Sequence, residues 1–471
     1  MPEKNLLWLP LDTAGTVFPG QNSKRWSNVF RLSVDLGQKI NPEILKTALS
    51  NTLDRFPSLK VRIRFGFFTN YYESNNAECP IRTDIGNFCY RISFKENNGY
   101  LLRVFYRGSR ISVDFYHALC DGHGGTVFIL TLAGEYLRLC GCDITSNRFV
   151  LDTKARSTDD ETEDAYLRYC GKDSKASLTD KRAYHKKGTP LPLHMCSYTT
   201  VFMSFEAVHA LSKGYGVTVT ELFAAILADI HYRKKLQQGK SRRPVSIQIP
   251  VNLRKFFPSD TLRNFVLCVT VSINSRKDEY TFEEILEAVS STLRKINNKK
   301  AHAAYISRTV KVGVRAIRFV PVRLKNLIVR TGFLFGAEYS TTALLSNLGP
   351  VELPEGMKEH VENLSFYTGP GLVNGARCGV ACIGDSLTFT FSNRYKEDDI
   401  ERDFLTRLSQ MGISTLVETN RDTDFSDIRG VTPGDKNAYS DETFIPSGNN
   451  QTRLKKYDMS LKERLRRYFY F

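Results

Sequence analysis

A histidine and an aspartate, His117 and Asp121, stand four residues apart directly before Gly122, Gly124 and Gly125. Imidazole, with an ordinary pKa of about 6.5, is the side chain best suited to take a proton from a hydroxyl or an amine near neutral pH. Glycines let the backbone turn tightly and allow a ligand to approach closely. The pattern therefore predicts a general base at His117, although a loop histidine with a purely structural role fits the same residues.

The neighbouring segments place this histidine between a strand and a helix. Residues 101–106 and 111–115 alternate as the two strands of a hairpin, and residues 126–139 have the apolar pattern of a long helix. Loops held by a rigid scaffold are where binding and catalytic residues commonly lie. The position of His117 in the chain thus favours a functional site over a surface loop.

The rest of the chain repeats this mixture of strands and helices. The patterns predict strands at 28–34, 60–68, 198–205, 245–251, 266–273, 341–346, 376–383 and 386–391, and helices at about 42–53, 220–235, 282–296 and 398–411. A polar, charged segment, 152–194, separates two halves with a similar order of elements. Since 471 residues are enough for two cores, we expect an α/β protein with one unit at 1–190 and another at 191–418.

Several segments together resemble a known family. The segment YHALCDG at 116–122 resembles the His-x-x-x-Asp-Gly signature of the CoA-dependent acyltransferase superfamily. The segments IPVNLR at 249–254, TLRNF at 261–265 and LSNLG at 345–349 follow in the same order as in alcohol acetyltransferases, polyketide-associated acyltransferases and peptide-synthetase condensation domains. The resemblance extends over residues 5–415.

The resemblance implies a fold and a role for each motif residue. Two α/β subdomains, each similar to a chloramphenicol acetyltransferase subunit, would meet as a pseudo-dimer around a tunnel. His117 would lie in the tunnel and act as the general base, with no covalent acyl-enzyme. Asp121 would be structural and pair with Arg254 of the other half, because an unpaired buried charge is costly. Gly122 would keep the space beside the histidine open.

Three further residues are candidate contacts to the substrate or to the developing oxyanion. Ser346 and Asn347 end a predicted strand that faces the junction of the halves, where both can donate hydrogen bonds. Asn264 lies in the TLRNF segment. Turn formation by the Ser-Asn-Leu-Gly sequence is the alternative explanation for Ser346 and Asn347.

Departures from the family pattern bear on the reaction. Condensation domains usually carry a second histidine just before the catalytic one, and Tyr116 stands there, which favours ester formation over amide formation. No Gly-x-Ser-x-Gly motif supplies a nucleophile. No carrier or adenylating domain is attached, so acyl-CoA is the expected co-substrate, with no permanently bound cofactor. We therefore expect an O-acyltransferase that moves an acetyl or longer acyl group to a hydroxyl acceptor. An amide-forming condensation enzyme and a non-catalytic binding module are the alternatives.

Composition argues against several other classes. The N-terminus has no secretion signal, and no apolar run approaches the roughly 18 residues that span a bilayer. The ten cysteines are scattered without CxxC spacing, which favours reduced thiols in a cytoplasmic protein and no metal site. No recognisable nucleic-acid reader accompanies the basic charge, so we expect no nucleic-acid partner.

The net charge of +16 comes from two segments. Residues 294–330 contain eleven Lys and Arg and no acidic residue, and residues 453–467 contain seven basic residues and two acidic ones. The first segment includes the pattern of a basic amphipathic helix at 306–318, which fits a solvated face, attraction of the CoA phosphates or contact with anionic lipid. After an expected flexible linker at 419–452, residues 453–471 form a predicted basic amphipathic helix. We expect peripheral contact with an anionic membrane, with docking of the tail on the protein itself as the alternative.

Overall fold

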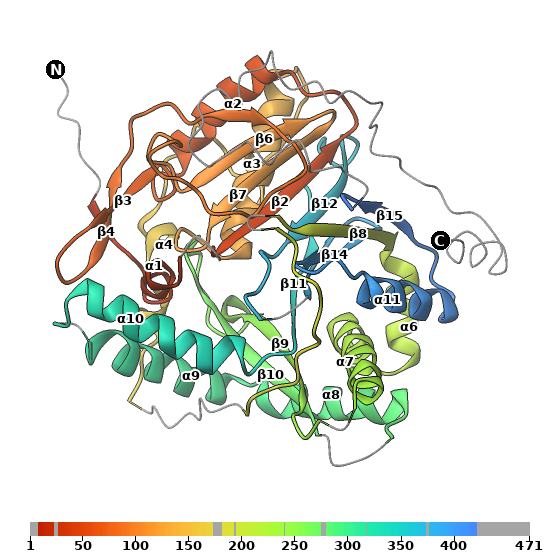
Figure 1. Ribbon diagram of the computed structural model, residues 1–471. Coiled ribbons are helices and arrows are strands. Elements are labelled where there is room, and N and C mark those ends of the chain that lie inside the picture. Colours follow the sequence, from red (N-terminus) through yellow and green to blue (C-terminus); the bar gives the residue numbers. More distant parts are fainter. Residues whose placement is uncertain are drawn as a thin grey trace, which may run out of the picture.

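The computed structural model describes residues 8–22, 27–172, 181–192, 195–239, 241–274, 279–317, 319–373 and 376–421. Its strands form three sheets, with helices packed against the two larger ones (Figure 1). The predicted linker, apart from its first three residues, and the predicted tail helix lie outside the described residues.

A five-stranded sheet forms the centre of the first half. Across the sheet the strands are β12 (Val361–Tyr367), β2 (Val29–Leu36), β7 (Arg110–Tyr116), β6 (Leu102–Arg107) and β5 (Ile81–Thr83). The helix α3 (Gly122–Leu139) packs on β2 and β7, and α2 (Pro42–Arg55) packs on α3. Because the side chain of Asp121 caps α3, the helix begins four residues before the predicted start at 126.

A smaller, three-stranded sheet also belongs to the first half. Its strands, in order, are β1 (Trp8–Pro10), β4 (Asn70–Ser74) and β3 (Val61–Phe65). The predicted strand at 60–68 is too long, because the backbone N–H of Gly66 donates to the carbonyl of Thr69 and the chain turns into β4 there.

A seven-stranded sheet forms the centre of the second half. Its order is β10 (Val266–Ile273), β9 (Val245–Asn252), β11 (Ala343–Val351), β13 (Ala376–Ile383), β14 (Ser386–Asn393), β8 (Ser197–Ser204) and β15 (Leu416–Thr419). The accompanying helices are α6 (Phe205–Gly214), α7 (Val219–Gln237), α8 (Phe282–Ile296) and α11 (Asp399–Gln410). Apolar side chains of this sheet and these helices form a second buried core.

Strand β12 belongs to the second half of the chain but completes the sheet of the first. It pairs antiparallel with β2, with Phe366 opposite Leu32. Both side chains lie in the first buried core, which the five-stranded sheet forms with α2 and α3. The hydroxyl of Thr388 in β14 donates to the carbonyl of Leu364 in β12 at 2.6 Å, so β12 also joins the two larger sheets. Neither this strand nor β1, β4, β5, β15 and α6 was predicted from the sequence. The division into units at residue 190 stays a prediction.

The basic segment forms two helices instead of one. The helix α9 (Lys299–Arg308) continues into a π-helical segment (Thr309–Arg315), and α10 (Val322–Phe333) begins after Pro321 and continues into a second π-helical segment (Leu334–Glu338). The predicted single helix at 306–318 is therefore wrong at its C-terminal end. The predicted apolar face of this helix is confirmed at Ile306 and Val310, which are buried. Arg318 lies outside the described residues.

Short helical turns connect the larger elements. They are η1 (Gly15–Val17), α1 (Phe18–Gln21), α4 (Asp159–Thr162), α5 (Ala165–Arg168) and η2 (Leu253–Lys255). Among the described residues, no helix combines the length and the apolar character that crossing a bilayer requires.

Candidate active site

His117 follows β7 directly and is held by backbone and ring contacts. Its backbone N–H donates to the carbonyl of Asn28 at 2.7 Å. Its ring stacks on Phe18 of α1, with centroids 4.5 Å apart, and meets the ring of Phe30 edge-on at 5.2 Å. Packing between aromatic rings restricts the orientation of the imidazole.

The side chain of Asn264 determines which imidazole nitrogen carries the proton. Its oxygen lies 3.0 Å from Nδ1 of His117. Its Nδ2 donates to a carboxylate oxygen of Asp12 at 3.2 Å and to the carbonyl of Ala118 at 3.4 Å, which orients the amide. Because the amide oxygen can only accept, Nδ1 of His117 carries the proton and Nε2 keeps its lone pair. This is the tautomer that a general base acting through Nε2 requires.

Burial lowers the pKa of His117 below its ordinary value of 6.5. A hydrogen bond with its own backbone, the charge of Asp121 and the hydrogen bond with Asn264 act in the opposite direction. The imidazole is therefore neutral at neutral pH and able to accept a proton.

Asp12 is a member of the site that the sequence analysis missed. It is 1% exposed, and its other carboxylate oxygen accepts from the backbone N–H of Gly15. Burial raises its pKa to about 6, although the charge of Arg263 opposes this rise. Asp12 stands in no motif, and no spacing pattern connects it to His117, so no local signal could have identified it.

The structure brings Asp121 and Arg254 into contact across the two halves. One carboxylate oxygen of Asp121 accepts from the backbone N–H of Gly124 at 3.1 Å. The other accepts from Nη1 of Arg254 at 2.8 Å and from the backbone N–H of Phe265 at 2.9 Å. Further donors of the guanidinium bind the carbonyl of Thr261, so the buried pair is supported on both sides. Burial alone would raise the pKa of Asp121. The charge of Arg254 is the main reason that this pKa lies below its ordinary value.

Two glycines allow the N-terminus of α3 to approach the second half. A Cβ at Gly124 would lie 1.9 Å from the carbonyl oxygen of Leu262, so a larger residue there would displace the segment that carries Asn264. A Cβ at Gly122 would lie 2.6 Å from Cδ2 of Leu348. The space beside Gly122 is thus filled by Leu348 of β11. The expectation that Gly122 keeps the space beside His117 open stays a prediction.

Ser346 and Asn347 lie within β11 and not at its end. Ser346 is opposite Gly379 of β13. Asn347 donates through Nδ2 to the hydroxyl of Thr220 at 2.9 Å, and its oxygen accepts from the backbone N–H of Gly349 at 2.7 Å. Both ends of this amide therefore hold β11 and the start of α7 in place.

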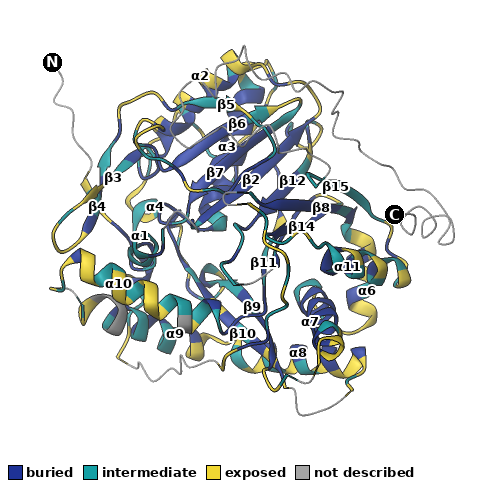
Figure 2. Cartoon of the chain, viewed as in Figure 1, coloured by how far each residue is buried: buried dark blue, intermediate teal, exposed yellow. Residues whose placement is uncertain are grey.

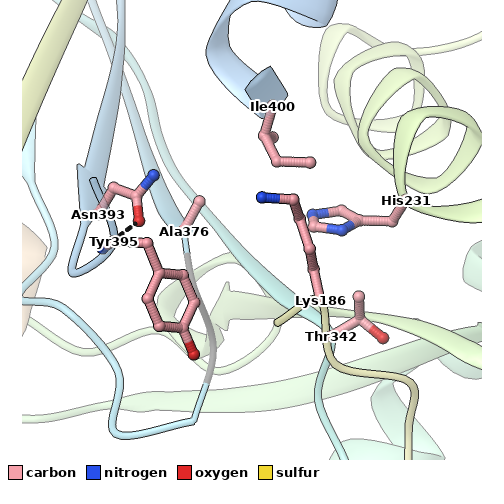
Figure 3. A pocket seen from close by; sticks show the side chains of 7 residues that line it. All are labelled: Lys186, His231, Thr342, Ala376, Asn393, Tyr395 and Ile400. Carbon is pink, nitrogen blue, oxygen red and sulfur yellow. Dashed lines mark hydrogen bonds between the residues drawn. The ribbon is translucent and has the colours of Figure 1, made fainter. Parts of the chain in front are cut away.

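A small cavity shares no residue with the site around His117. Figure 3 shows its lining residues, Lys186, His231, Thr342, Ala376, Asn393, Tyr395 and Ile400. His231 is 3% exposed, and neither of its ring nitrogens has a hydrogen-bond partner among the described residues. Burial lowers the pKa of His231 to about 4, with the charge of Lys186 acting in the same direction. Among the described residues, no group of three or more His, Cys, Asp or Glu is placed to hold a metal ion.

Comparison with solved structures identifies the fold. Polyketide synthase associated protein 5 from Mycobacterium tuberculosis is 14% identical, with a TM-score of 0.56, over 85% of this chain and 96% of that one. TRI101 of F. sporotrichioides, complexed with coenzyme A and T-2, is 11% identical, with a TM-score of 0.60, over 87% of this chain and 99% of that one. The starter condensation domain of rhizomide synthetase RzmA, in complex with C8-CoA and Leu-SNAC, is 13% identical, with a TM-score of 0.54, over 86% of this chain and 93% of that one.

No family model and no curated protein matches the sequence. The likeness to the solved structures therefore concerns the fold, and it covers nearly the whole length of each of the three. The predicted α/β architecture of two related subdomains is confirmed. The expected tunnel between the subdomains stays a prediction.

Proposed function

From the fold shared with the CoA-dependent acyltransferase and condensation group, we propose that the protein is an acyltransferase that moves an acetyl or longer acyl group from acyl-CoA to a hydroxyl acceptor. The observation that carries the proposal is the neutral imidazole of His117, whose Nδ1–H is held by Asn264 while Nε2 keeps its lone pair. The CoA ligands in the TRI101 and RzmA structures support acyl-CoA as the co-substrate.

In the proposed reaction the acceptor hydroxyl faces Nε2 of His117. As the hydroxyl oxygen attacks the thioester carbonyl, Nε2 takes its proton, and a tetrahedral intermediate forms. The carbon–sulfur bond then breaks, and the imidazolium returns the proton to the leaving thiolate. The products are an ester and free CoA, and no acyl-enzyme forms.

Ser346 is the proposed donor to the oxyanion of the intermediate. It was one of three candidates, but the amide of Asn264 is engaged with His117 and Asp12, and the amide of Asn347 with Thr220 and Gly349. Asp121 and Arg254 are positioning residues, since they join the loop after His117 to the segment that carries Asn264.

The experiment that tests this function measures free thiol after the full-length protein is mixed with a panel of acyl-CoAs and with alcohol or amine acceptors. Mass spectrometry identifies the products. We expect esters, and we expect His117→Ala to lower the rate by about a hundredfold or more, because a positioned general base contributes that much. His209→Ala is the matched control, because His209 is exposed on α6.

Other outcomes contradict the proposal. Thiol release that is unchanged in the His117→Ala variant would exclude the assigned base. Products formed only from amines would indicate an amide-forming condensation enzyme, and binding of CoA without turnover would indicate a binding module. We also propose a cytoplasmic enzyme that meets the membrane peripherally.

A further inference from the structure

Exposed apolar side chains gather on one surface of the molecule. Of the twelve large apolar side chains that are exposed among the described residues, seven lie on the tip of the β3–β4 hairpin and on or just before α10. We call this surface the docking face, and its residues are Phe65, Phe67, Phe68, Phe319, Leu324, Leu327 and Ile328. Scattered exposed apolar residues are ordinary, but a cluster of this kind marks an interaction surface.

The hairpin tip and α10 form one continuous surface. The backbone N–H of Val322 donates to the carbonyl of Phe67 at 2.8 Å. The ammonium group of Lys325 donates to the carbonyl of Phe68 at 2.7 Å. Figures 1 and 2 show the hairpin loop beside one end of α10, with exposed residues in yellow on both elements.

The helix α10 turns an apolar stripe outward. Leu324, Leu327 and Ile328 follow each other at helical spacing and are 51%, 60% and 47% exposed. On the other side of the helix, Asn326 packs against Gly20 of α1, where an added Cβ would lie 3.0 Å from the backbone of Asn326. A surface helix normally turns its apolar stripe to the core, and the reverse orientation leaves this stripe available to a partner.

The charge around the docking face is positive. Arg323 and Arg330 are exposed on α10, and no acidic residue occurs between 294 and 330. An anionic bilayer offers negative headgroups to the arginines and an apolar interior to the aromatic and aliphatic side chains. We propose that the docking face inserts into the headgroup region of an anionic membrane.

A single short helix, α1, connects the docking face to His117. The helix α1, against which α10 packs, carries Phe18, and the ring of Phe18 stacks on His117. Docking would therefore bring His117 close to the bilayer, and the acceptor class is an apolar alcohol dissolved in the membrane. This assignment of the acceptor rests on the proposed function, whereas the docking itself does not.

Vesicle flotation of the full-length protein tests the docking. The vesicles consist of phosphatidylcholine alone or of phosphatidylcholine with phosphatidylserine. The triple variant Phe67→Ser, Leu324→Ser, Leu327→Ser removes apolar anchors at exposed positions, and we expect it to bind vesicles at least about tenfold more weakly. A variant with Arg323→Glu and Arg330→Glu should lose the preference for phosphatidylserine.

A matched control carries Leu139→Ser and Leu236→Ser, at positions that are each 42% exposed on other elements. This control should bind vesicles like the wild type, and all variants should keep the thermal unfolding midpoint of the wild type. His117→Ala should also bind normally, so that failure of docking and failure of catalysis can be distinguished.

An activity measurement tests the acceptor class. We expect the triple variant to lose activity towards a long-chain alcohol embedded in vesicles and to keep activity towards a short, water-soluble alcohol. Vesicle binding that is unchanged in the triple variant would overturn the proposal. So would a stable dimer of the wild type that the triple variant loses without any binding to vesicles, because the face would then belong to a second copy of the chain.

Discussion

At the scale of single residues, the chemistry proposed for His117 depends on hydrogen bonds that reach it through the amide of Asn264. Asp12 accepts from Asn264, and Asn264 accepts from the imidazole. The amide can transmit orientation but no charge, so the imidazole stays neutral and its Nε2 stays basic. A carboxylate in place of the amide would raise the pKa of the imidazole.

This arrangement predicts opposite pH effects for two substitutions of Asn264. The hydrogen bond that the imidazole donates to Asn264 raises the pKa of His117, so Asn264→Ala should move the acid limb of kcat/KM to lower pH and reduce kcat roughly tenfold or more. Asn264→Asp should move the acid limb to higher pH, because a carboxylate favours the imidazolium. The measurement is kcat/KM across the acidic range, and profiles that coincide with the wild type would show that Asn264 has a structural role only.

The burial of His231 leads us to expect that the stability of the protein depends on pH, independently of the reaction. Its pKa is about 4 in the folded protein, below the ordinary 6.5 of an unfolded histidine, so the unfolded state binds a proton first as the pH falls. The contribution of the neutral His231 to the free energy of unfolding is fully present above pH 6.5 and is lost as the pH falls towards 4. At pH 5 the loss amounts to about 2 kcal/mol.

The measurement is urea unfolding at pH 7 and pH 5. The variant His231→Gln should lose less stability than the wild type over this interval, by about 2 kcal/mol. The control is His209→Ala at an exposed position. This variant should lose as much stability between pH 7 and pH 5 as the wild type. Equal losses in the wild type and in His231→Gln would contradict the prediction.

At the scale of elements, one buried ion pair determines how α3 meets the second half. Asp121 caps α3 and binds Arg254, which follows β9, and the backbone N–H of Phe265, which precedes β10. The pair therefore positions the segment that includes Asn264 against the loop that carries His117. Removing one partner leaves the other charge buried without compensation.

We expect Asp121→Asn to lower the free energy of unfolding by about 3 kcal/mol or more, because the cap of α3 survives but the charge of Arg254 is left unpaired. Chemical denaturation measures this change, and kcat should fall as well. The control is Asp398→Asn, which breaks the exposed pair with Arg402 and should cost less than about 1 kcal/mol. Equal effects of the two substitutions would refute a special role of the buried pair.

At the scale of the whole molecule, β12 makes the two halves depend on each other. Without it, β2 would be an edge strand with unpaired backbone groups, and the side chains of Leu364 and Phe366 would be missing from the first core. We expect a fragment of residues 1–190 to aggregate or to lack fixed tertiary packing. Size-exclusion chromatography and near-ultraviolet circular dichroism test this, and a monomeric fragment with cooperative unfolding would contradict it.

Most of the fold followed from the sequence because its signals are local. Alternating residues in β2 and the apolar spacing in α7 indicate strand and helix wherever they occur in a chain. The segment of β12 was missed because its partners in β2 lie far away in the sequence, so its burial has no local sign. The same holds for Asp12 and Phe18, which reach His117 only through the folding of distant segments.

The sequence by itself determined the alternation of strands and helices, the resemblance to an acyltransferase fold and the motif that contains His117 and Asp121. Only the tertiary structure decided that Asn264 and Asp12 hold the tautomer of the histidine, that Leu348 fills the space beside Gly122, and that α10 turns its apolar stripe outward. The physical reason is that tautomer, burial and exposure depend on contacts between residues distant in the chain, whereas periodicity and motifs are properties of neighbours.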